Sequence, residues 1–376
     1  MANEAFGKNL RYQREKLGLT QGELAKQLFV SFQAVSAWER GTSVPDLENA
    51  VRLSKVLGIG LDSLLRDREE TLYVGIDGGG TKTEFCAFLP DGTVKKRVVL
   101  GTTNPNDIGE EKSFEVLYKG LDTLLDGATP RGIFAGIAGL SVGQWKTVFS
   151  ARLKKSYNCE IWTDTDAANV LSMGADPENS AMVICGTGSC VFVRRGEKTY
   201  RLGGWGQLFD ESGSAYDVGK DAIRHTLAVQ DGLEDPSLLS VSVEEKLGCG
   251  IFQGLSTLYE KGRPYIASFA RLVVDAEEEG DAVSRRILQK NADRLGMLMR
   301  TANARYGMSG VFVASGGFFA SKVFCQMVEE VSGCTLYLPE LPPILGACVE
   351  AMRRSNIAVT EEFMKNFTES YRRQVC

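Results

Sequence analysis

The chain has 376 residues and a formal net charge of −5, since 48 Asp and Glu outnumber 43 Lys and Arg. This charge excludes a protein that coats nucleic acid nonspecifically, although a local DNA-reading face is compatible with it because charges act within a Debye length. The single histidine, His225, excludes sites built from several histidines. No apolar stretch approaches the roughly 18 residues of a membrane helix, and the first residues lack the apolar core of a signal peptide. We therefore expect a cytoplasmic protein without membrane contact.

The length suits two or three domains, and the composition changes at a few places along the chain. We expect a first domain over 1–66, a short charged linker over 67–71 and two lobes over 72–180 and 181–354. A terminal helix over 355–376 is expected to pack on the first lobe or between subunits. Because the linker has no Gly/Ser-rich or Pro-rich stretch, the domains on either side of it should communicate closely.

Residues 9–65 have the apolar pattern of five short amphipathic helices. Thr20 and Glu23 have the spacing of a capping box, and Ser31 is a suitable N-cap for the next helix. A helix, a tight turn and a second short helix place one helix across the DNA backbone and the other in the major groove. We predict a helix-turn-helix domain that binds double-stranded DNA. A helical bundle used for protein contacts is the alternative, because the six basic and four acidic residues of 1–44 leave only a modest positive excess.

This segment resembles the Cro and phage-repressor class of helix-turn-helix domains through LTQGELAKQL, VSFQAVSAWERG and PDLENAVRLSKVLGIGLDSLL. The resemblance implies that Gln21 holds a phosphate, whereas Gln33, Ser36 and Ala37 face base edges, with adenine as a suitable partner for Gln33. Phe32 replaces the polar residue usual at its position, and either packs on a thymine methyl or covers the turn. Such domains usually read two half-sites as a dimer, so a homodimer is expected. The natural phosphate contacts are three arginines: Arg11, Arg14 and Arg40.

Two stretches of the remaining chain share a strand, a Gly-rich turn and a second strand: LYVGIDGGGTKTEFCAFL at 72–89 and AMVICGTGSCVFV at 181–193. Their glycines let backbone N–H groups approach an anion, and their hydroxyl groups add donors. One such turn is weak support, because hairpins also use glycine for positive φ. The two together, with Asp77 inside the first, predict a duplicated fold with paired phosphate-holding hairpins. Neither turn has the spacing of the Walker loop.

Residues 72 to about 350 resemble the actin-like ATPase superfamily, and within it the N-acetylglucosamine kinase and BadF/BadG-type ATPase family. The matching pieces occur in order as GIDGGGTKT, GTTN, TDTDAAN, CGTGS, GGWGQLFDESGSAYDVG, ASGGFF and PPILGA. The resemblance implies a multidomain chain in which an all-α helix-turn-helix domain precedes an α/β, duplicated, ribonuclease H-like domain of the actin type. It also implies ATP and Mg²⁺ as cofactors and a small-molecule sugar as ligand.

The same resemblance assigns residues of the site. Asp77 holds Mg²⁺ through water, and Asn104 holds a sugar hydroxyl. Asp210 falls where the family places an acid near substrate and nucleotide, in a piece that also supplies Gly204 and Trp205. This acid lies one residue further from the following Gly-Ser than in the animal sugar kinases, a departure that bears on which sugar binds. Phosphate or adenosine contacts are implied for three turns: Gly78, Gly79, Gly80, Thr81 and Lys82; Gly186, Thr187, Gly188 and Ser189; and Gly316 and Gly317.

Phosphoryl transfer to a sugar needs a carboxylate that orients the acceptor hydroxyl and accepts its proton. Asp166 is the first candidate, because it matches the Asp-Ala pair of the family. Asp164 is a rival two residues earlier. If the segment is a strand, the two side chains point the same way and share the site. Two solvated loop acids are the alternative.

Three functions are compatible with these features. The first is a sugar-responsive transcription factor whose actin-like domain binds ATP and an amino sugar or related hexose. The second is an active kinase for N-acetylglucosamine or a similar hexose, with secondary DNA binding. The third is an ATPase that acts on a protein partner or on its own conformation. Both phosphate turns and the aspartate are intact, so we favour a combination of the first two.

Some BadF-type relatives activate dehydratases through a shared iron-sulfur cluster, which needs cysteines on exposed loops. The nine cysteines here are scattered through apolar, strand-like runs without a close CxxC pair. We expect buried free thiols, and do not expect the dehydratase role.

Overall fold

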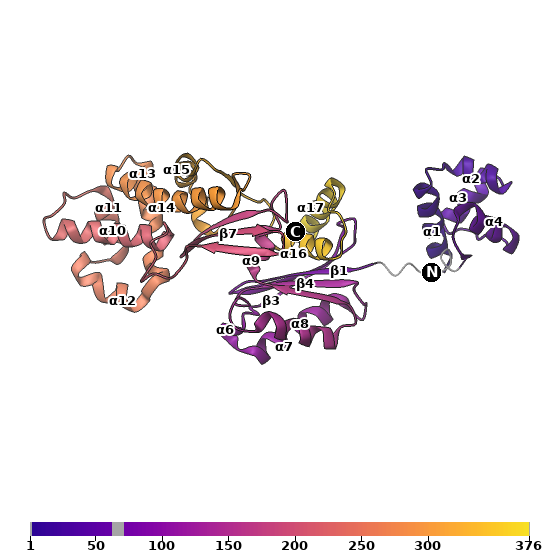
Figure 1. Cartoon of the computed structure of the whole chain (residues 1–376), viewed down its shortest axis with the longest axis horizontal. Coiled ribbons are helices and arrows are strands. Elements are labelled where there is room, and N and C mark those ends of the chain that lie inside the picture. The colour runs from indigo at the N-terminus through magenta and orange to yellow at the C-terminus, as the bar shows by residue number, and fades with distance from the viewer. Residues whose placement is uncertain (1, 62–70, 376) are drawn as a thin grey trace. The chain divides into compact units, whose positions relative to one another are not determined.

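The computed structural model describes residues 2–61 and 71–375, and the chain divides into two compact units, 1–71 and 72–376 (Figure 1). The described part of the first unit is helical, whereas the second contains strands and helices. This is the predicted order of an all-α domain followed by an α/β domain. The predicted fifth helix of the first domain and the predicted linker over 67–71 fall largely outside the described residues.

The helix-turn-helix is present in the first unit. Thr20 Oγ1 accepts a hydrogen bond from Glu23 N at 3.2 Å, while the Glu23 carboxylate accepts from Thr20 N at 2.7 Å, which completes the predicted capping box. Ser31 Oγ accepts from Ala34 N at 3.1 Å and caps the next helix. Between the two helices Phe29 adopts a left-handed φ of 59°. The helices are α1 (Ala2–Lys16), α2 (Gln21–Leu28), α3 (Phe32–Glu39) and α4 (Leu47–Leu57).

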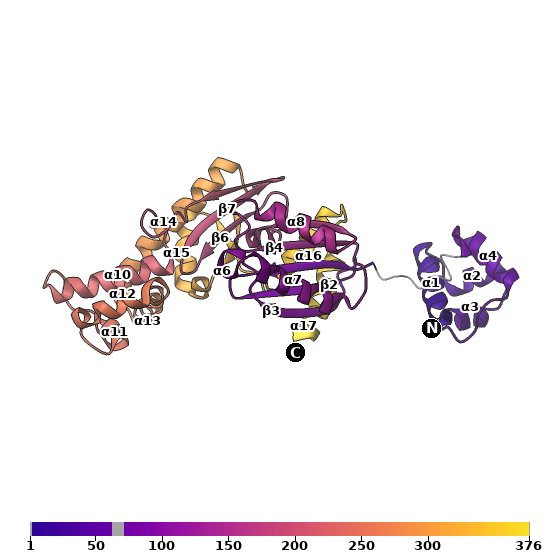
Figure 2. The ribbon, with the colours of Figure 1, turned by 90° about the horizontal axis from the view of Figure 1, so that it is seen from below.

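The second unit contains two five-stranded sheets with the same strand arrangement (Figures 1 and 2). The orders are β3-β2-β1-β4-β5 and β8-β7-β6-β9-β10, and each joins three antiparallel strands to two parallel ones. This repetition confirms the predicted duplication and the actin-like fold. The strands are β1 (Tyr73–Gly78), β2 (Lys82–Phe88), β3 (Val94–Gly101), β4 (Gly132–Ile137), β5 (Glu160–Asp164), β6 (Ala181–Cys185), β7 (Ser189–Arg195), β8 (Lys198–Leu202), β9 (Val311–Ser315) and β10 (Thr335–Tyr337).

Helices cover both sheets, and in both views α10 to α13 lie at the end of the unit farthest from the first sheet. Their order along the chain is α6 (Pro105–Ile108), α7 (Glu110–Leu125), α8 (Trp145–Ser156), α9 (Asp166–Leu171), α10 (Ala215–Gln230), α11 (Leu238–Leu247), α12 (Ile251–Ala267), α13 (Ala270–Glu278), α14 (Ala282–Tyr306), the 3₁₀ helix η1 (Gly317–Ala320), α15 (Lys322–Ser332), α16 (Ile344–Arg354) and α17 (Glu361–Val375). Within the described residues, none of the helices combines the length and the apolar character needed to cross a membrane.

The alternation of side chains along β1 decides where Asp77 points. Val74 and Ile76 belong to the core that includes residues of α7 and α8. Gly75 faces the other way, because a Cβ built on it would lie 2.7 Å from Cys348 Sγ of α16. Since successive residues of a strand alternate between faces, Asp77 points to the face of the sheet that α16 covers.

The chain returns to the first sheet at its end. The predicted second lobe over 181–354 included α16, but α16 packs in one core with β1, β2 and β4 of the first sheet. The second lobe therefore ends before Ile344, and α17 lies on the first lobe as well. Val94 N donates a hydrogen bond to Ser370 Oγ at 2.8 Å, and the Tyr371 hydroxyl donates to Glu84 Oε1 at 2.6 Å. The assignment of α16 to the second lobe is corrected in this way, because only the tertiary fold shows the return, whereas α17 takes the first of the two positions expected for it.

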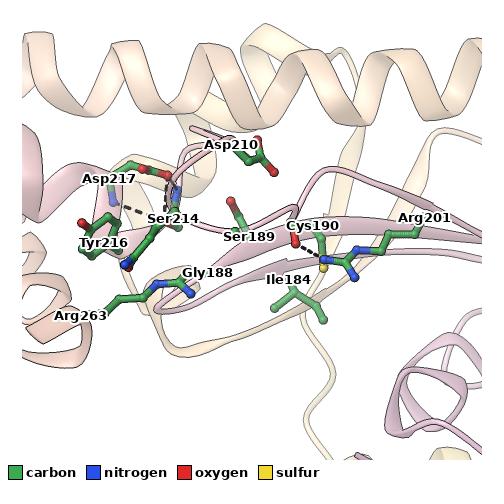
Figure 3. Close-up of a pocket in the computed structure, with 14 residues that line it drawn as sticks. Ile184, Gly188, Ser189, Cys190, Arg201, Asp210, Ser214, Tyr216, Asp217 and Arg263 are labelled. Atoms are coloured by element: carbon green, nitrogen blue, oxygen red, sulfur yellow. Dashed lines mark hydrogen bonds between the residues drawn. The ribbon is translucent and has the colours of Figure 1, made fainter. Parts of the chain in front are cut away.

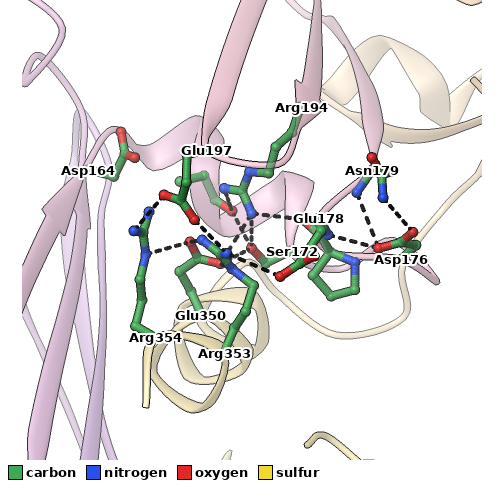
Figure 4. Close-up of polar contacts among 12 residues, drawn as sticks. Asp164, Ser172, Asp176, Glu178, Asn179, Arg194, Glu197, Glu350, Arg353 and Arg354 are labelled. Atoms are coloured by element: carbon green, nitrogen blue, oxygen red, sulfur yellow. Dashed lines mark hydrogen bonds and ion pairs between the residues drawn. The ribbon is translucent and has the colours of Figure 1, made fainter. Parts of the chain in front are cut away.

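A buried polar cluster joins the two lobes (Figure 4). Glu350 of α16 is 0% exposed and accepts hydrogen bonds from Arg194 Nη1 of β7 at 3.1 Å and from Ser172 Oγ, just after α9, at 2.8 Å. The other carboxylate oxygen of Glu350 accepts a hydrogen bond from Arg353 Nη2 at 2.8 Å. Arg353 Nη1 donates to Oε1 of the exposed Glu197 at 3.0 Å. The buried carboxylate therefore has cations from both lobes around it.

Candidate active site and DNA interface

The candidate catalytic carboxylates lie at one edge of the first sheet. Strands β1, β4 and β5 run parallel, and their register aligns Asp77 with Gly136 and Gly136 with Asp164. Asp77 and Asp164 therefore stand at the same level on two strands that flank β4, roughly 10 Å apart from the spacing of neighbouring strands. The carboxyl ends of these strands bring the predicted acids of TDTDAAN close to the predicted metal ligand.

Asn169, which sequence reasoning did not single out, holds Asp77 in place. Its Nδ2 donates to Asp77 Oδ1 at 2.6 Å and to the Gly136 carbonyl at 3.1 Å. Asn169 is 0% exposed, and a Cβ built on Gly346 would lie 1.7 Å from its carbonyl oxygen. Only glycine allows α16 to approach α9 this closely. The ILGA piece at the start of α16 therefore supports Asp77 through the asparagine that ends TDTDAAN.

Asp166 and Asp164 do not share a strand face as the sequence suggested. The strand β5 ends at Asp164, whose carboxylate forms an ion pair with Lys146 of α8. Thr165 is the N-cap of α9, so Asp166 is the first residue of that helix. No ion pair is found for Asp166 within 2–61 and 71–375. The two acids thus have different surroundings: Asp164 is paired with Lys146, whereas Asp166 has no lysine or arginine partner among the described residues.

The electrostatics of the pair suit a divalent cation. Burial raises the pKa of Asp77 to about 6; the hydrogen bond from Asn169 opposes the rise, and the negative charges of Asp166 and Glu84 add to it. Burial also raises the pKa of Asp166 above its ordinary value. A cation beside Asp77 would relieve the repulsion. Mg²⁺ prefers oxygen ligands and commonly uses one or two carboxylates with several waters and nucleotide phosphates, so Asp77 fits the predicted role.

The two Gly-rich turns have equivalent positions in the two sheets. The first joins β1 to β2 and is closed by a hydrogen bond from Gly79 N to the Lys82 carbonyl at 2.9 Å. The second joins β6 to β7 and is closed from Gly186 N to the Gly188 carbonyl at 2.9 Å. Gly78 is buried, whereas four further members of these two predicted turns are exposed: Gly80, Thr81, Lys82 and Thr187.

The predicted adenosine turn lies against the start of the second phosphate turn. Gly316 has a φ of 110°, and a Cβ built on it would lie 2.3 Å from the carbonyl oxygen of Cys185, the last residue of β6. Gly317 then begins η1. Both glycines are exposed. The structure therefore brings together two pieces, CGTGS and ASGGFF, that are far apart in the sequence.

A pocket of about 290 Å³ opens beside the second turn (Figure 3). Four predicted residues line it: Gly188, Ser189, Gly204 and Asp210. Asp210 accepts hydrogen bonds from Trp205 N at 3.0 Å and from Ser212 Oγ. Burial raises the pKa of Cys190, also in this pocket, to about 11; Arg201 opposes the rise, and the charges of Asp166 and Asp210 add to it.

Two predicted sugar ligands do not line this pocket. Asn104 is the N-cap of α6, where its Oδ1 accepts from Asn106 N at 3.1 Å and its Nδ2 donates to Asp107 Oδ2 at 2.6 Å. Trp205 is 64% exposed, with the Arg201 guanidinium 5.0 Å from the centre of its ring. Five further pocket residues were not singled out from the sequence. Ser214, Tyr216 and Asp217 stand in the same piece as Asp210, whereas Arg201 and Arg263 lie outside every piece that carries the resemblance.

The predicted DNA contacts are distributed over the surface of α3 and its neighbours. Phe32 is 53% exposed and Gln33 is exposed, whereas Ser36 and Ala37 are half-buried. Arg40 is exposed at the end of α3. Arg11 is exposed on α1 and forms an i,i+4 ion pair with Glu15 at 2.9 Å. Because more than half of its surface is exposed, Phe32 is not buried over the turn between α2 and α3.

The prediction that Arg14 contacts a phosphate is corrected by the structure. Arg14 is buried, and its Nε and Nη2 donate to the two carboxylate oxygens of Glu39 at 2.6 and 3.0 Å. Its Nη1 donates to the Leu19 carbonyl at 2.7 Å. The arginine therefore ties α1 to α3 and is not available for DNA. Gln21 joins the same network, because its Nε2 donates one hydrogen to Glu39 Oε2 at 2.7 Å.

The cysteines of the described residues are all free thiols. Three of them are partly buried (Cys159, Cys190 and Cys325), and Cys249 is exposed, so the expectation of burial holds for part of the set. The fully buried ones are Cys86, Cys185, Cys334 and Cys348.

Known proteins resemble each unit separately. The N-acetylmuramic acid/N-acetylglucosamine kinase of Clostridium acetobutylicum is 31% identical over 235 residues, which are 59% of this chain and 76% of the kinase. The N-acetyl-D-glucosamine kinase of Dictyostelium discoideum is 30% identical over 317 residues, which are 75% of this chain and 98% of that protein. The HTH-type transcriptional regulator DicA of Escherichia coli is 49% identical over 55 residues, or 15% of this chain and 41% of the regulator.

Family models match the same two regions. Residues 10–64 match the helix-turn-helix family. Residues 74–351 match the BadF/BadG/BcrA/BcrD ATPase family, and this match spans both sheets and most of the chain. The chain belongs to the BadF/BadG/BcrA/BcrD ATPase family and carries a helix-turn-helix domain in front of it.

Proposed function

We propose that this protein is a DNA-binding transcriptional regulator whose actin-like domain binds Mg-ATP and phosphorylates N-acetylglucosamine or a related hexose. The observation that carries the proposal is the arrangement of two carboxylates in the first lobe. Asp77 is held by a hydrogen bond from Asn169, and Asp166 has no cation partner in the described part of the chain. Asn169, which binds Asp77, and Asp166 belong to the same short helix, α9, so one element places both carboxylates at this edge of the first sheet.

In this proposal each group has one task. The backbone N–H groups of the two Gly-rich turns bind the phosphates of ATP. Asp77 holds Mg²⁺ through water, and the ion, when bound, neutralises charge that develops on the phosphates. Asp166 accepts a hydrogen bond from the acceptor hydroxyl of the sugar and takes its proton as the phosphoryl group transfers. Its raised pKa, caused by burial, makes it a better proton acceptor than a solvated aspartate.

The test is phosphoryl transfer from Mg-ATP to a panel of hexoses, run beside a measurement of operator affinity with and without each sugar. We expect turnover with N-acetylglucosamine or a related hexose, and a change in operator affinity in its presence. No turnover with any sugar, together with sugar-dependent DNA affinity, would reduce the proposal to a sensor. If neither turnover nor a sugar effect is found, the proposal fails for this domain.

For the first unit, we propose that the exposed face of α3 reads double-stranded DNA, with two chains on two half-sites. Gln33→Ala should relax the preference at one base pair by about 1–3 kcal/mol while leaving phosphate contacts in place. Competition binding to an operator mutated base by base measures this effect, and the stoichiometry of the complex reports the dimer. Gln27→Ala, which removes an exposed glutamine from α2, is the matched control and should leave the preference unchanged. An unchanged preference with Gln33→Ala would remove this residue from base recognition.

A further inference from the structure

Arg263 reaches the second phosphate turn from a break in α12. Within this helix Gly262 has a φ of 63° and a ψ of −156°, and Pro264 follows two residues later. A φ of this sign is favourable only for glycine, and proline cannot donate the next helical hydrogen bond. The break directs Arg263, between these two residues, out of the helical path and into the pocket beside the second turn (Figure 3).

The guanidinium of Arg263 lies directly against the turn. Its Nη2 donates a hydrogen bond to the Thr187 carbonyl at 3.2 Å, and a Cβ built on Gly188 would lie 2.9 Å from the same nitrogen. The guanidinium carbon lies over the ring of Tyr216, 5.5 Å from its centre. Glycine at position 188 thus leaves the space that the guanidinium occupies.

Arg263 keeps unused hydrogen-bonding capacity at this place. Within the described part of the chain its buried Nε has no partner, although a guanidinium offers five donors. No ion pair with a carboxylate is found for it in the described ranges. The two acids of the same pocket have other partners. Asp217 caps its own helix, since its Oδ2 accepts from Ser214 N at 3.0 Å and from Ser214 Oγ at 2.8 Å, and Asp210 accepts from Trp205 N and Ser212 Oγ. The positive charge of Arg263, for which the described residues provide no counterion, therefore lies beside the backbone N–H groups of the second Gly-rich turn, which suit an anion.

We propose that Arg263 is a nucleotide-binding residue, which binds a phosphate group of the ATP held by the second turn. The inference rests on the proposed function and adds a residue to its site. A planar, permanently charged guanidinium binds phosphate oxygens in pairs, which a lysine cannot do. Because the arginine contacts a phosphate and not the base, it should strengthen the binding of ATP and ADP but not that of adenosine.

The test measures direct binding of ATP, ADP and adenosine to the full-length chain by calorimetry in the absence of sugar, so turnover does not enter. Arg263→Gln should lower ATP affinity about 10- to 100-fold, the usual effect of losing a charge-assisted hydrogen bond, and leave adenosine affinity unchanged. Arg263→Lys should recover part of the loss. Arg271→Gln removes the same charge from an exposed site on α13, paired with Asp275, and should change neither affinity.

The outcomes separate this inference from the proposed function. If the wild type does not bind ATP, the proposed function itself fails. If the wild type binds ATP and Arg263→Gln binds it equally well, only the role of Arg263 is overturned. If Arg263→Gln lowers the affinities for ATP and adenosine equally, the arginine only stabilises the conformation of the turn, and the inference is likewise overturned. The melting temperature of each variant without ligand controls for misfolding.

Discussion

The Asp166→Asn variant should transfer the phosphoryl group about 10²- to 10⁴-fold more slowly than the wild type, the range typical for loss of a general base. Asparagine has nearly the same shape, so α9 should begin as before, but it cannot take a proton from the sugar hydroxyl. ATP affinity should change little, because Asp166 does not line the pocket beside the second turn. Steady-state kinetics with a hexose substrate and calorimetric binding of ATP together measure this separation.

Asp164→Asn is the matched control for this experiment. It removes an acid two residues away that is already paired with Lys146 at the end of β5. We expect its rate to stay within a few-fold of the wild type, since a half-exposed ion pair contributes little to stability or positioning. A large loss with Asp164→Asn and a normal rate with Asp166→Asn would exchange the roles of the two acids.

Removal of the buried carboxylate at the junction of the lobes should have the largest effect on stability. Glu350→Gln leaves the buried Arg194 guanidinium without its counterion, and breaking a buried ion pair in this way costs about 3–5 kcal/mol of the free energy of unfolding. Denaturant-induced unfolding followed by circular dichroism measures the change. Glu197→Gln removes an exposed partner of Arg353 and should cost less than about 1 kcal/mol.

The same carboxylate gives the stability a predictable pH dependence. Burial alone would raise the pKa of Glu350, but the hydrogen bond from Arg353 and the charges of Arg194 and Arg353 lower it below the ordinary value of 4.5. A group with a lowered pKa in the folded state contributes stability above its unfolded pKa and loses it as the pH falls through the folded value. The wild type should therefore lose stability below about pH 4.5 more steeply than Glu350→Gln. Equal slopes for the two proteins would contradict this origin of the acid sensitivity.

Local sequence signals were sufficient for much of the fold. The capping box at Thr20 and the glycine turns after β1 and β6 are set by neighbouring residues, so the helix-turn-helix and the duplicated hairpins were predictable. Arg14 was misjudged because its partner, Glu39, lies 25 residues away and nothing near Arg14 indicates burial. Asp164 is the last residue of β5, whereas Asp166 is the first residue of α9. Thr165 between them is a residue type that commonly caps helices, and this local signal indicates the end of the strand.

The supporting residues of the site were harder to find. Asn169 forms a hydrogen bond with Asp77, from which it is separated by 92 positions of the chain. Its place in the TDTDAAN piece, which resembles the family, is the only sequence signal that pointed to it. Arg263 is marked in the sequence only by the Gly-x-Pro break around it. The position of α16 depended on topology, since an amphipathic helix fits equally well on either sheet.

The return of α16 and α17 to the first sheet has a consequence for synthesis of the protein. The helix-turn-helix unit and the second lobe are each made from one continuous stretch, whereas the core of the first lobe needs residues from 344 onward. Domains generally fold as units in the order in which they leave the ribosome. The helix-turn-helix unit is therefore expected to fold before the first lobe, whose core is completed only when α16 and α17 have been made. A message truncated before codon 344 would yield a chain with a complete DNA-reading unit and an unfinished kinase-like domain.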